Sequence, residues 1–118
     1  MDARERGCSD QGRAVVARGE IWWAEHPDAG RRPFLVLTRQ AAVPLLHSVI
    51  GVPATRTIRH IPTEVVLDSA DGMPEECALS LDNLAVVPKE LFRERITSLS
   101  IVRMREVCRA LSLASGCA

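Results

Sequence analysis

The sequence predicts a mainly β fold with some α structure, namely a small antiparallel barrel followed by a C-terminal helix. Three observations lead to this fold class. The chain has 118 residues, which is the length of a single domain. Most of it consists of short runs of strand-forming residues separated by Pro, Gly or Asp. A clear helical period comes at the end of the chain, after Ser100.

The strands are predicted from apolar, β-branched or aromatic runs that turn residues interrupt. Pro33 is expected at the first position of its strand and Pro53 just after the end of the next, because proline cannot donate to a sheet ladder. Short turns or helical pieces are expected at 41–46 and 88–92, and the last strand is expected at a sheet edge. The predicted strands are 19–25, 34–38, 47–52, 63–67, 77–81, 84–87 and 93–99.

The last segment predicts a helix over residues 101–114, with Ser100 as its N-terminal cap. Its apolar residues recur at spacings of three, four and three, which places them on one face. That face is expected to pack on the barrel, and its members are Ile101, Met104, Cys108 and Leu111.

The chain is expected to be a soluble, cytoplasmic protein that does not enter a membrane. No apolar run comes near the length of about 20 residues that a membrane span requires, and no segment resembles a signal peptide. Residues 1–17 are polar, mixed in charge and without a period, so they predict a disordered tail. Residues 18–118 are then one domain.

The cysteines indicate neither a metal site nor a bound cofactor. None of them forms a CxxC pair, and no Cys/His cluster has the spacing of a zinc site. Without a secretory signal they are expected to be reduced thiols. They are Cys8, Cys77, Cys108 and Cys117.

The net charge is zero, but the charges are unevenly placed along the chain. Residues 18–59 carry +3, residues 64–90 carry −6 and residues 93–109 carry +3. Fourteen of the 15 basic residues are arginine, whose planar guanidinium suits phosphate. A GC-rich genome produces the same bias toward arginine, so composition alone does not show RNA binding.

Three separated motifs are the most informative part of the sequence: Arg18-Gly19-Glu20-Ile21-Trp22, Arg32-Pro33-Phe34-Leu35-Val36-Leu37, and Pro53-Ala54-Thr55-Arg56-Thr57-Ile58-Arg59. Together they resemble the MazF/PemK family of toxin endoribonucleases, or mRNA interferases, of type II toxin–antitoxin systems. The segments 63–67, 81–84 and 96–100 support the match, which spans about residues 18–114. The resemblance implies an SH3-like or CcdB-like barrel.

The resemblance also implies an activity and partners. Family members cut single-stranded RNA sequence-specifically without a metal. The ribose 2′-hydroxyl attacks the adjacent phosphorus and leaves a 2′,3′-cyclic phosphate and a 5′-hydroxyl, so DNA is not a substrate. A homodimer forms the RNA groove, and a cognate MazE-like antitoxin with an extended, often acidic tail occupies it.

By the same resemblance, Arg32 and Thr55 are the catalytic residues. An arginine held by the rigid Pro33 can stabilise the charge that builds on a cleaved phosphate. A threonine hydroxyl after an apolar strand can donate to a phosphate oxygen or orient the attacking group. Each residue also has an ordinary interpretation, as a solvated loop arginine and as a turn threonine. Arg31 is the alternative to Arg32.

The group that transfers the proton is left open among His26, His60 and Asp82. Asp82 matches an aspartate of the PemK branch, but the arginine two residues before it in that branch is Ser80 here. His26 lies in the first loop, where that branch carries a histidine. His47 is expected to be a partly buried strand residue. The residues predicted to bind RNA are Arg31, Arg56, Arg59 and His60.

Trp22 and Trp23 are neighbours on a predicted strand and therefore point to opposite faces. One of them is expected in the core. The other could stack on a base, line a dimer interface or cover a groove, and core or interface packing is favoured.

Two other functions fit this fold. A non-enzymatic CcdB-like toxin shares the barrel and poisons DNA gyrase, but such proteins lack the Arg-Pro and Thr pairing. An RNA-binding module that has lost catalysis is the third possibility. Because Arg32 and Thr55 are both present, the nuclease is favoured.

Overall fold

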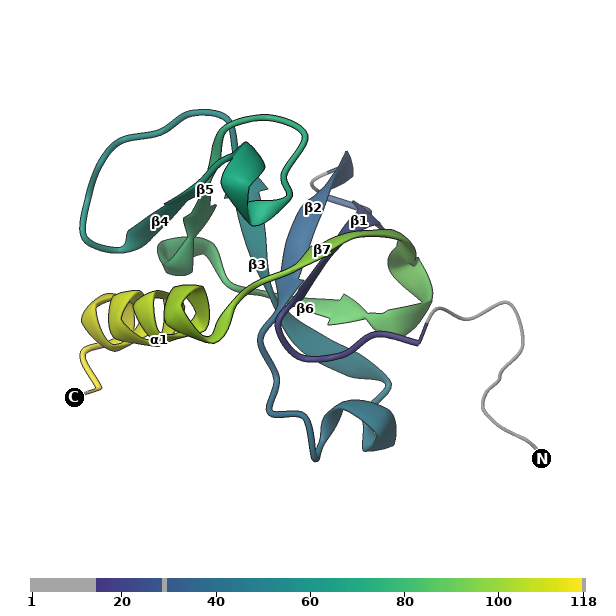
Figure 1. Cartoon of the computed structure of the whole chain (residues 1–118). Coiled ribbons are helices and arrows are strands. Elements are labelled where there is room, and N and C mark those ends of the chain that lie inside the picture. The colour runs from purple at the N-terminus through teal and green to yellow at the C-terminus, as the bar shows by residue number, and fades with distance from the viewer. Residues whose placement is uncertain (1–14, 29, 118) are drawn as a thin grey trace.

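A computed structural model describes residues 15–28 and 30–117. Its centre is an antiparallel sheet of seven strands (Figure 1). The order is β4-β5-β3-β2-β1-β7, and β6 pairs with β3 beside this path. The strands are β1 (Glu20–His26), β2 (Gly30–Val36), β3 (Ser48–Thr55), β4 (Glu64–Leu67), β5 (Cys77–Ser80), β6 (Ala85–Pro88) and β7 (Phe92–Ser98).

The connections contain four short 3₁₀ turns, and one helix, α1 (Ile101–Ser115), ends the fold. The turns are η1 (Val43–Leu45), η2 (Ser69–Asp71), η3 (Leu81–Asn83) and η4 (Lys89–Leu91). These elements confirm the predicted fold class, a mainly β antiparallel domain with a C-terminal helix. None of the helices in the described residues is long and apolar enough to cross a membrane.

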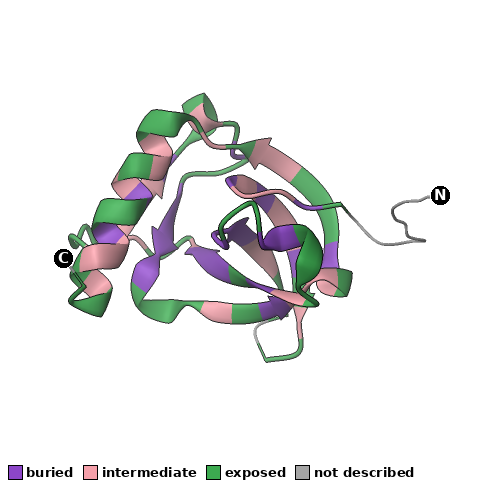
Figure 2. Ribbon diagram, turned by 90° about the horizontal axis from the view of Figure 1, so that it is seen from below, coloured by how far each residue is buried: buried purple, intermediate pink, exposed green. Residues whose placement is uncertain are grey.

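The sheet buries apolar side chains on both of its faces, in two clusters. Successive strand residues point to opposite faces, so the neighbours Phe34 and Leu35 of β2 enter different clusters. One cluster joins Leu35 to Val107 and Ala110 of α1. Figure 2 shows the buried residues where α1 meets the sheet and the exposed ones along its outer side. The second cluster contains Ala24, Phe34, Val36, Val43, Val49, Val87 and Phe92.

Two prolines lie inside strands, contrary to the sequence prediction. Pro33 is the fourth residue of β2 and pairs with Trp23, and Pro53 pairs with Phe34. The reason is the local pairing. The ladder between β2 and β3 begins only at Phe34, and β3 changes partner from β6 to β5 around Pro53. Each proline therefore has a ladder partner on only one side among the described residues. A proline is tolerated at such a position because it has no N–H that a second partner strand would have to accept.

Helix α1 has the predicted N-terminal cap, but its buried face differs from the predicted one. The Ser100 hydroxyl accepts from the Arg103 N–H at 3.2 Å. Ile101 is 72% exposed and Cys108 is also exposed, so their predicted core positions are wrong. The same spacing of three, four and three also fits a second apolar stripe on the helix, which contains neither Ile101 nor Cys108. The structure turns that stripe toward the core: Val107 is buried, with buried Ala110 beside it, and Met104, Leu111 and Ala114 are partly buried.

A charged contact stabilises α1 in the orientation that buries this face. The Arg103 guanidinium donates to both oxygens of Asp71, at 2.9 and 3.0 Å, and so joins α1 to η2. It also donates to Glu106 at 2.6 Å and to the Val66 carbonyl at 2.9 Å. The Arg103 hydrogen bonds hold the pKa of the Asp71 carboxyl below its ordinary value of 3.8.

Replacing Arg103 with Met is expected to lower the free energy of unfolding by about 2 kcal/mol at pH 7, because Asp71 then loses its partner while 11% exposed. Since the pKa of Asp71 is lowered in the folded protein, this stabilisation is complete above the unfolded pKa of 3.8. It is lost as the pH falls through the folded pKa. Urea unfolding at pH 7 and pH 3 measures the difference between wild type and variant, which should shrink at pH 3.

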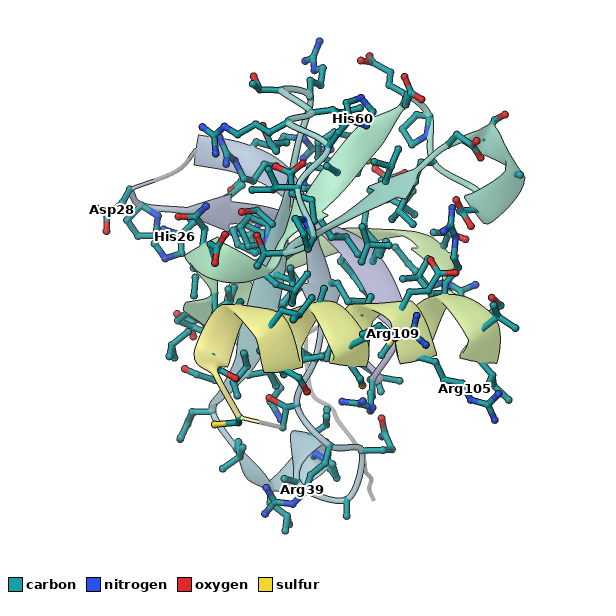
Figure 3. All side chains as sticks on the ribbon, turned by 90° about the vertical axis from the view of Figure 1, so that its left-hand side faces the viewer. His26, Asp28, Arg39, His60, Arg105 and Arg109 are labelled. Atoms are coloured by element: carbon teal, nitrogen blue, oxygen red, sulfur yellow. The ribbon has the colours of Figure 1, made fainter. Side chains whose placement is uncertain are left out.

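Arg109→Met is the matched control, because Arg109 is an exposed arginine of the same helix (Figure 3). It is expected to change the free energy of unfolding by less than about 0.5 kcal/mol. An equal effect of the two substitutions, or a difference that does not depend on pH, would contradict the role given to the Arg103–Asp71 contact.

Three further predictions concern individual residues. His47 is exposed and precedes β3, so its predicted place as a partly buried strand residue is wrong. Strand pairing with β6 begins one residue later, at Ser48.

Residues 1–14 of the predicted tail, including Cys8, lie outside the described residues, while Val16 is buried in the second cluster. The other three cysteines are free thiols, and the division into tail and domain stays a prediction.

Candidate functional site

Arg32 of β2 and Thr55 at the end of β3 come together through the register of these two strands. The ladder pairs Val36 with Gly51 and Phe34 with Pro53. The ladder ends at that second pair, and Arg32 and Thr55 each lie two residues beyond it, at positions that would oppose each other in the same register. Opposite residues of an antiparallel pair point to the same face. The fold therefore brings the two predicted catalytic side chains to one place.

Both residues line the same two cavities. The first, of about 370 Å³, we call the Trp23 cavity; its walls come from the β1–β2 hairpin, the end of β3 and the segment before β5. The second, of about 250 Å³, we call the Asn83 cavity; Ser80, Asn83 and Arg59 line it. Because Arg32, Thr55 and Thr57 line both, they lie on the boundary between the two cavities.

Arg32 differs from its neighbours in its electrostatic surroundings. Arg31 lies 3.7 Å from Glu94, and Arg56 lies 3.4 Å from Glu75. Among the residues that the structure describes, Arg32 has no carboxylate partner, although it is only partly exposed. Its guanidinium is therefore available for an anion such as a phosphate.

The Thr55 hydroxyl is oriented by the turn that follows β3. Its oxygen accepts from the Thr57 N–H at 3.1 Å. This is the local turn bond expected of a threonine in any function. Because the bond uses a lone pair of the oxygen, the hydroxyl hydrogen stays free to donate to a ligand in either cavity.

Comparison with known proteins identifies the fold and the family. Residues 17–114 match the family model described as PemK-like, MazF-like toxin of type II toxin–antitoxin system. The chain belongs to the PemK/MazF toxin family. This match covers all three sequence motifs and every strand of the sheet.

The relatives of this PemK/MazF toxin include proteins of Mycobacterium tuberculosis. Probable endoribonuclease MazF5 of strain ATCC 25618 / H37Rv is 42% identical over 105 residues, which cover 88% of this chain and 96% of the relative. Probable endoribonuclease MazF2 of strain CDC 1551 / Oshkosh is 40% identical over 103 residues, which cover 86% and 100%.

Solved structures agree with the sequence comparison. The M. tuberculosis toxin MazF-mt6 superposes with a TM-score of 0.76 at 29% identity, over 82% of this chain and 96% of that one. An endoribonuclease in complex with its cognate antitoxin, from a mycobacterial species, has a TM-score of 0.78 at 23% identity, over 88% and 98%. The second likeness shows the fold alone. The matched family does not favour the CcdB-like alternative.

The three predicted proton-transfer residues line neither cavity of this PemK/MazF toxin. His26 accepts the Asp28 N–H on Nδ1 at 3.1 Å, and Figure 3 shows the two residues side by side, apart from His60. Asp82 accepts from the Thr63 hydroxyl at 2.5 Å. The structure does not bring these groups together with Arg32, and their proposed roles stay predictions.

The residues predicted to bind RNA divide between the cavities. Arg31 and Arg56 line the Trp23 cavity, and Arg59 lines the Asn83 cavity. His60 lines neither, and it has a left-handed backbone with φ of 54°. Three of the four predicted residues are therefore beside the place where Arg32 and Thr55 meet.

Cys77 also lines the Trp23 cavity, so its protonation state matters for any chemistry there. Burial, and then the negative charges of Asp71, Glu75 and Glu76, raise the pKa of its thiol to about 11. The thiol is therefore protonated at neutral pH. It cannot act there as a general base or as a thiolate nucleophile.

The sequence patterns do not indicate most of the remaining lining residues. Glu75 and Met73 come from the connection between β4 and β5, and Asn83 from η3, where its amide donates to the Ser80 hydroxyl at 2.7 Å. These residues follow no motif or period, so only the folded chain places them at the site. Ser80 stands out in the sequence only because the PemK branch has an arginine there.

Trp22 and Trp23 take the two faces that strand geometry predicts. Trp22 packs edge-on against Phe92, with ring centroids 6.4 Å apart, beside the second cluster. Trp23 lines the Trp23 cavity, where the Arg31 guanidinium carbon lies 4.9 Å from its ring centre. One tryptophan is thus a packing residue, and the other faces the candidate site.

Proposed function

We propose that this chain is a toxin endoribonuclease that cuts single-stranded RNA at a phosphate held between Arg32 and Thr55. One observation carries the proposal: the two residues each lie two positions beyond the last ladder pair of β2 and β3, they line the same two cavities, and Arg32 has no carboxylate partner among the described residues. Relatives called probable endoribonucleases at 40% and 42% identity support it.

The proposed reaction is an internal transesterification. The ribose 2′-oxygen forms a bond to the adjacent phosphorus, and the bond from phosphorus to the next 5′-oxygen breaks. The proton leaves the 2′-hydroxyl, and the departing 5′-oxygen gains one. The products are a 2′,3′-cyclic phosphate and a 5′-hydroxyl. The reaction needs aligned atoms, charge stabilisation and proton transfer, and it requires no metal ion.

Arg32 and Thr55 supply the charge stabilisation in this reaction. Negative charge builds on the non-bridging oxygens as the phosphorus becomes five-coordinate. The Arg32 guanidinium donates N–H groups to those oxygens, and the Thr55 hydroxyl donates to one of them. With the phosphate on the boundary, the nucleotides on its two sides enter the Trp23 cavity and the Asn83 cavity.

For the proton transfer we retain His26 and Asp82 as candidates, with His60 as the third. None of them lines either cavity. Cys77 is excluded as a base at neutral pH by its raised pKa of about 11.

We further propose that the protein works as a cytoplasmic homodimer that a cognate MazE-like antitoxin neutralises. The support comes from similar folds: an endoribonuclease solved in complex with its cognate antitoxin, and a MazE–MazF complex from Deinococcus radiodurans with a TM-score of 0.73 at 24% identity.

The expected result of the direct test is cleavage of a mixed-sequence RNA in the presence of EDTA. The cut site is then placed in a short oligonucleotide, and a matched oligonucleotide carries one 2′-deoxyribose immediately before the cut. The RNA should be cut to a cyclic phosphate and a 5′-hydroxyl, detected by mass spectrometry. The deoxy version should stay intact because it lacks the nucleophile.

Two outcomes would count against the proposal. Cleavage of the deoxy oligonucleotide, or products with a 5′-phosphate, would exclude attack by the 2′-hydroxyl. A folded protein that cuts no RNA but inhibits gyrase would favour the CcdB-like function.

A further inference from the structure

We propose that the Trp23 cavity is a nucleobase subsite in which Glu75 selects guanine next to the cleaved phosphate. This inference rests on the proposed endoribonuclease activity. It assigns a specificity residue that no sequence motif contains.

The position of the cavity makes it the natural place for a base. Arg32 and Thr55 line it, so a phosphate bound to them lies at its edge. A nucleotide's base is only one sugar away from its phosphate. The base on one side of the cut can therefore enter this cavity, of about 370 Å³, without the RNA backbone leaving Arg32.

The walls of the cavity suit a flat ring. The Arg31 guanidinium carbon lies 4.9 Å from the centre of the Trp23 ring and so covers one face of that ring, and the exposed Glu94 carboxylate lies 3.7 Å from the same guanidinium. Aromatic rings and guanidinium planes are the surfaces on which proteins stack unpaired RNA bases. Met73 and Pro74 supply an apolar wall from the segment before β5.

A site that binds only a phosphate does not require a carboxylate, yet Glu75 lines the Trp23 cavity. A carboxylate lining a cavity that receives a polyanion repels the phosphates and lowers affinity. The ion pair with Arg56 offsets part of this repulsion, and hydrogen bonds that the ligand donates to the carboxylate offset more of it. RNA has such donors on the edges of its bases.

The arrangement of Glu75 and Arg56 favours one base. Guanine alone has two adjacent N–H donors, N1–H and the N2 amino group, on its Watson–Crick edge, and its O6 acceptor lies next to them. The two Glu75 oxygens match the donors, and Arg56, 3.4 Å from Glu75, can donate to O6. Cytosine, adenine and uracil each offer one donor group on that edge.

The Arg56–Glu75 pair is accessible to an incoming base. The Arg56 side chain is 81% exposed and that of Glu75 is 62% exposed. An ion pair this exposed contributes little to stability, so its partners exchange to a ligand at low cost. The pair therefore acts as an open recognition group and not as a fixed structural contact.

The test compares cleavage preferences on an RNA pool randomised around the cut. The wild type should prefer guanine at one position adjacent to the cut, read by sequencing the product ends. In Glu75→Gln, the preference for guanine over adenine at that position should fall by about tenfold. Glu76→Gln removes the same charge from the next exposed residue, which does not line the cavity, and should keep the wild-type preference.

A second measurement uses the wild-type protein alone and does not depend on how the variant folds. Two synthetic RNAs differ only in guanine or inosine at the preferred position. Inosine keeps O6 and N1–H but lacks the N2 amino group, so its RNA should be cut about fivefold more slowly, on the scale of one lost hydrogen bond.

Each result bears on the inference. Equal cutting of the guanine and inosine RNAs, an unchanged preference in Glu75→Gln, or a wild-type preference for another base at this position would overturn the guanine subsite. Each of these leaves the endoribonuclease activity intact. A wild type that cuts no RNA would overturn the activity and the subsite together, so the two failures are distinguishable.

Discussion

Arg32→Ala is expected to lower the rate of RNA cleavage roughly 100- to 1,000-fold while the protein stays folded. The physical reason is the loss of the guanidinium that faces the growing charge on the phosphate. Arg32 has no ion pair among the described residues and is only partly buried, so its removal should change the free energy of unfolding by less than about 1 kcal/mol. Single-turnover cleavage of the mapped oligonucleotide measures the rate, and urea unfolding measures the stability.

Arg39→Ala is the matched control for this experiment. It removes the same charge from an exposed arginine that lines neither the Trp23 cavity nor the Asn83 cavity (Figure 3). Its cleavage rate should stay within about twofold of the wild type. Arg32→Lys keeps the charge but loses the planar fork, so an intermediate rate is expected. A folded Arg32→Ala protein with a wild-type rate would remove Arg32 from the catalytic centre.

The largest effect on stability is expected from Gly72→Ala, at roughly 3 kcal/mol of unfolding free energy. Gly72 follows η2 and has φ of 92°, a conformation that costs an L-residue energy. A Cβ atom there would overlap the Thr97 hydroxyl oxygen and lie 2.8 Å from the Thr97 Cβ. Thr97 cannot easily move aside, because its hydroxyl donates to the Asp71 carbonyl at 2.9 Å.

Gly116→Ala separates the cost of a positive φ from the cost of the close contact with Thr97. Gly116 also has a positive φ, 75°, but an added Cβ meets no atom within 4 Å. It should therefore cost only the conformational energy, about 1 kcal/mol. Urea unfolding of both variants measures the difference. Equal losses would show that Thr97 relaxes without cost and that the close contact is unimportant.

Much of the fold follows from the sequence alone. The strand runs and the cap at Ser100 are local signals, and six of the seven strands and the helix begin within one residue of their predicted starts, while β2 begins four residues before its predicted start. The errors come from pairing between distant segments. Pro33 and Pro53 lie within strands because of partner changes in the sheet, which no single segment encodes. The buried face of α1 is ambiguous in the sequence because two stripes share one spacing, and the contact between Arg103 and Asp71 favours one of them.

The candidate site is predictable only in part, for a related reason. Arg32 and Thr55 belong to motifs, and the resemblance of those motifs to a family is enough to select them. Glu75 belongs to no motif and reaches the cavity through the connection between β4 and β5. His26 and Asp82 lie outside both cavities, although the same resemblance suggests them. Short sequence patterns do not contain the path of a connection, so they cannot indicate residues whose position depends on it.

The Arg103–Asp71 contact has a consequence for how such toxins diversify. It holds the end of η2 against α1, just before the segment that carries Met73 and Glu75. The proposed catalytic pair, Arg32 and Thr55, comes instead from the central strands β2 and β3. Under the proposed function, substitutions in the short stretch after Gly72 are expected to change the base preference of cleavage while the charge-stabilising pair is kept.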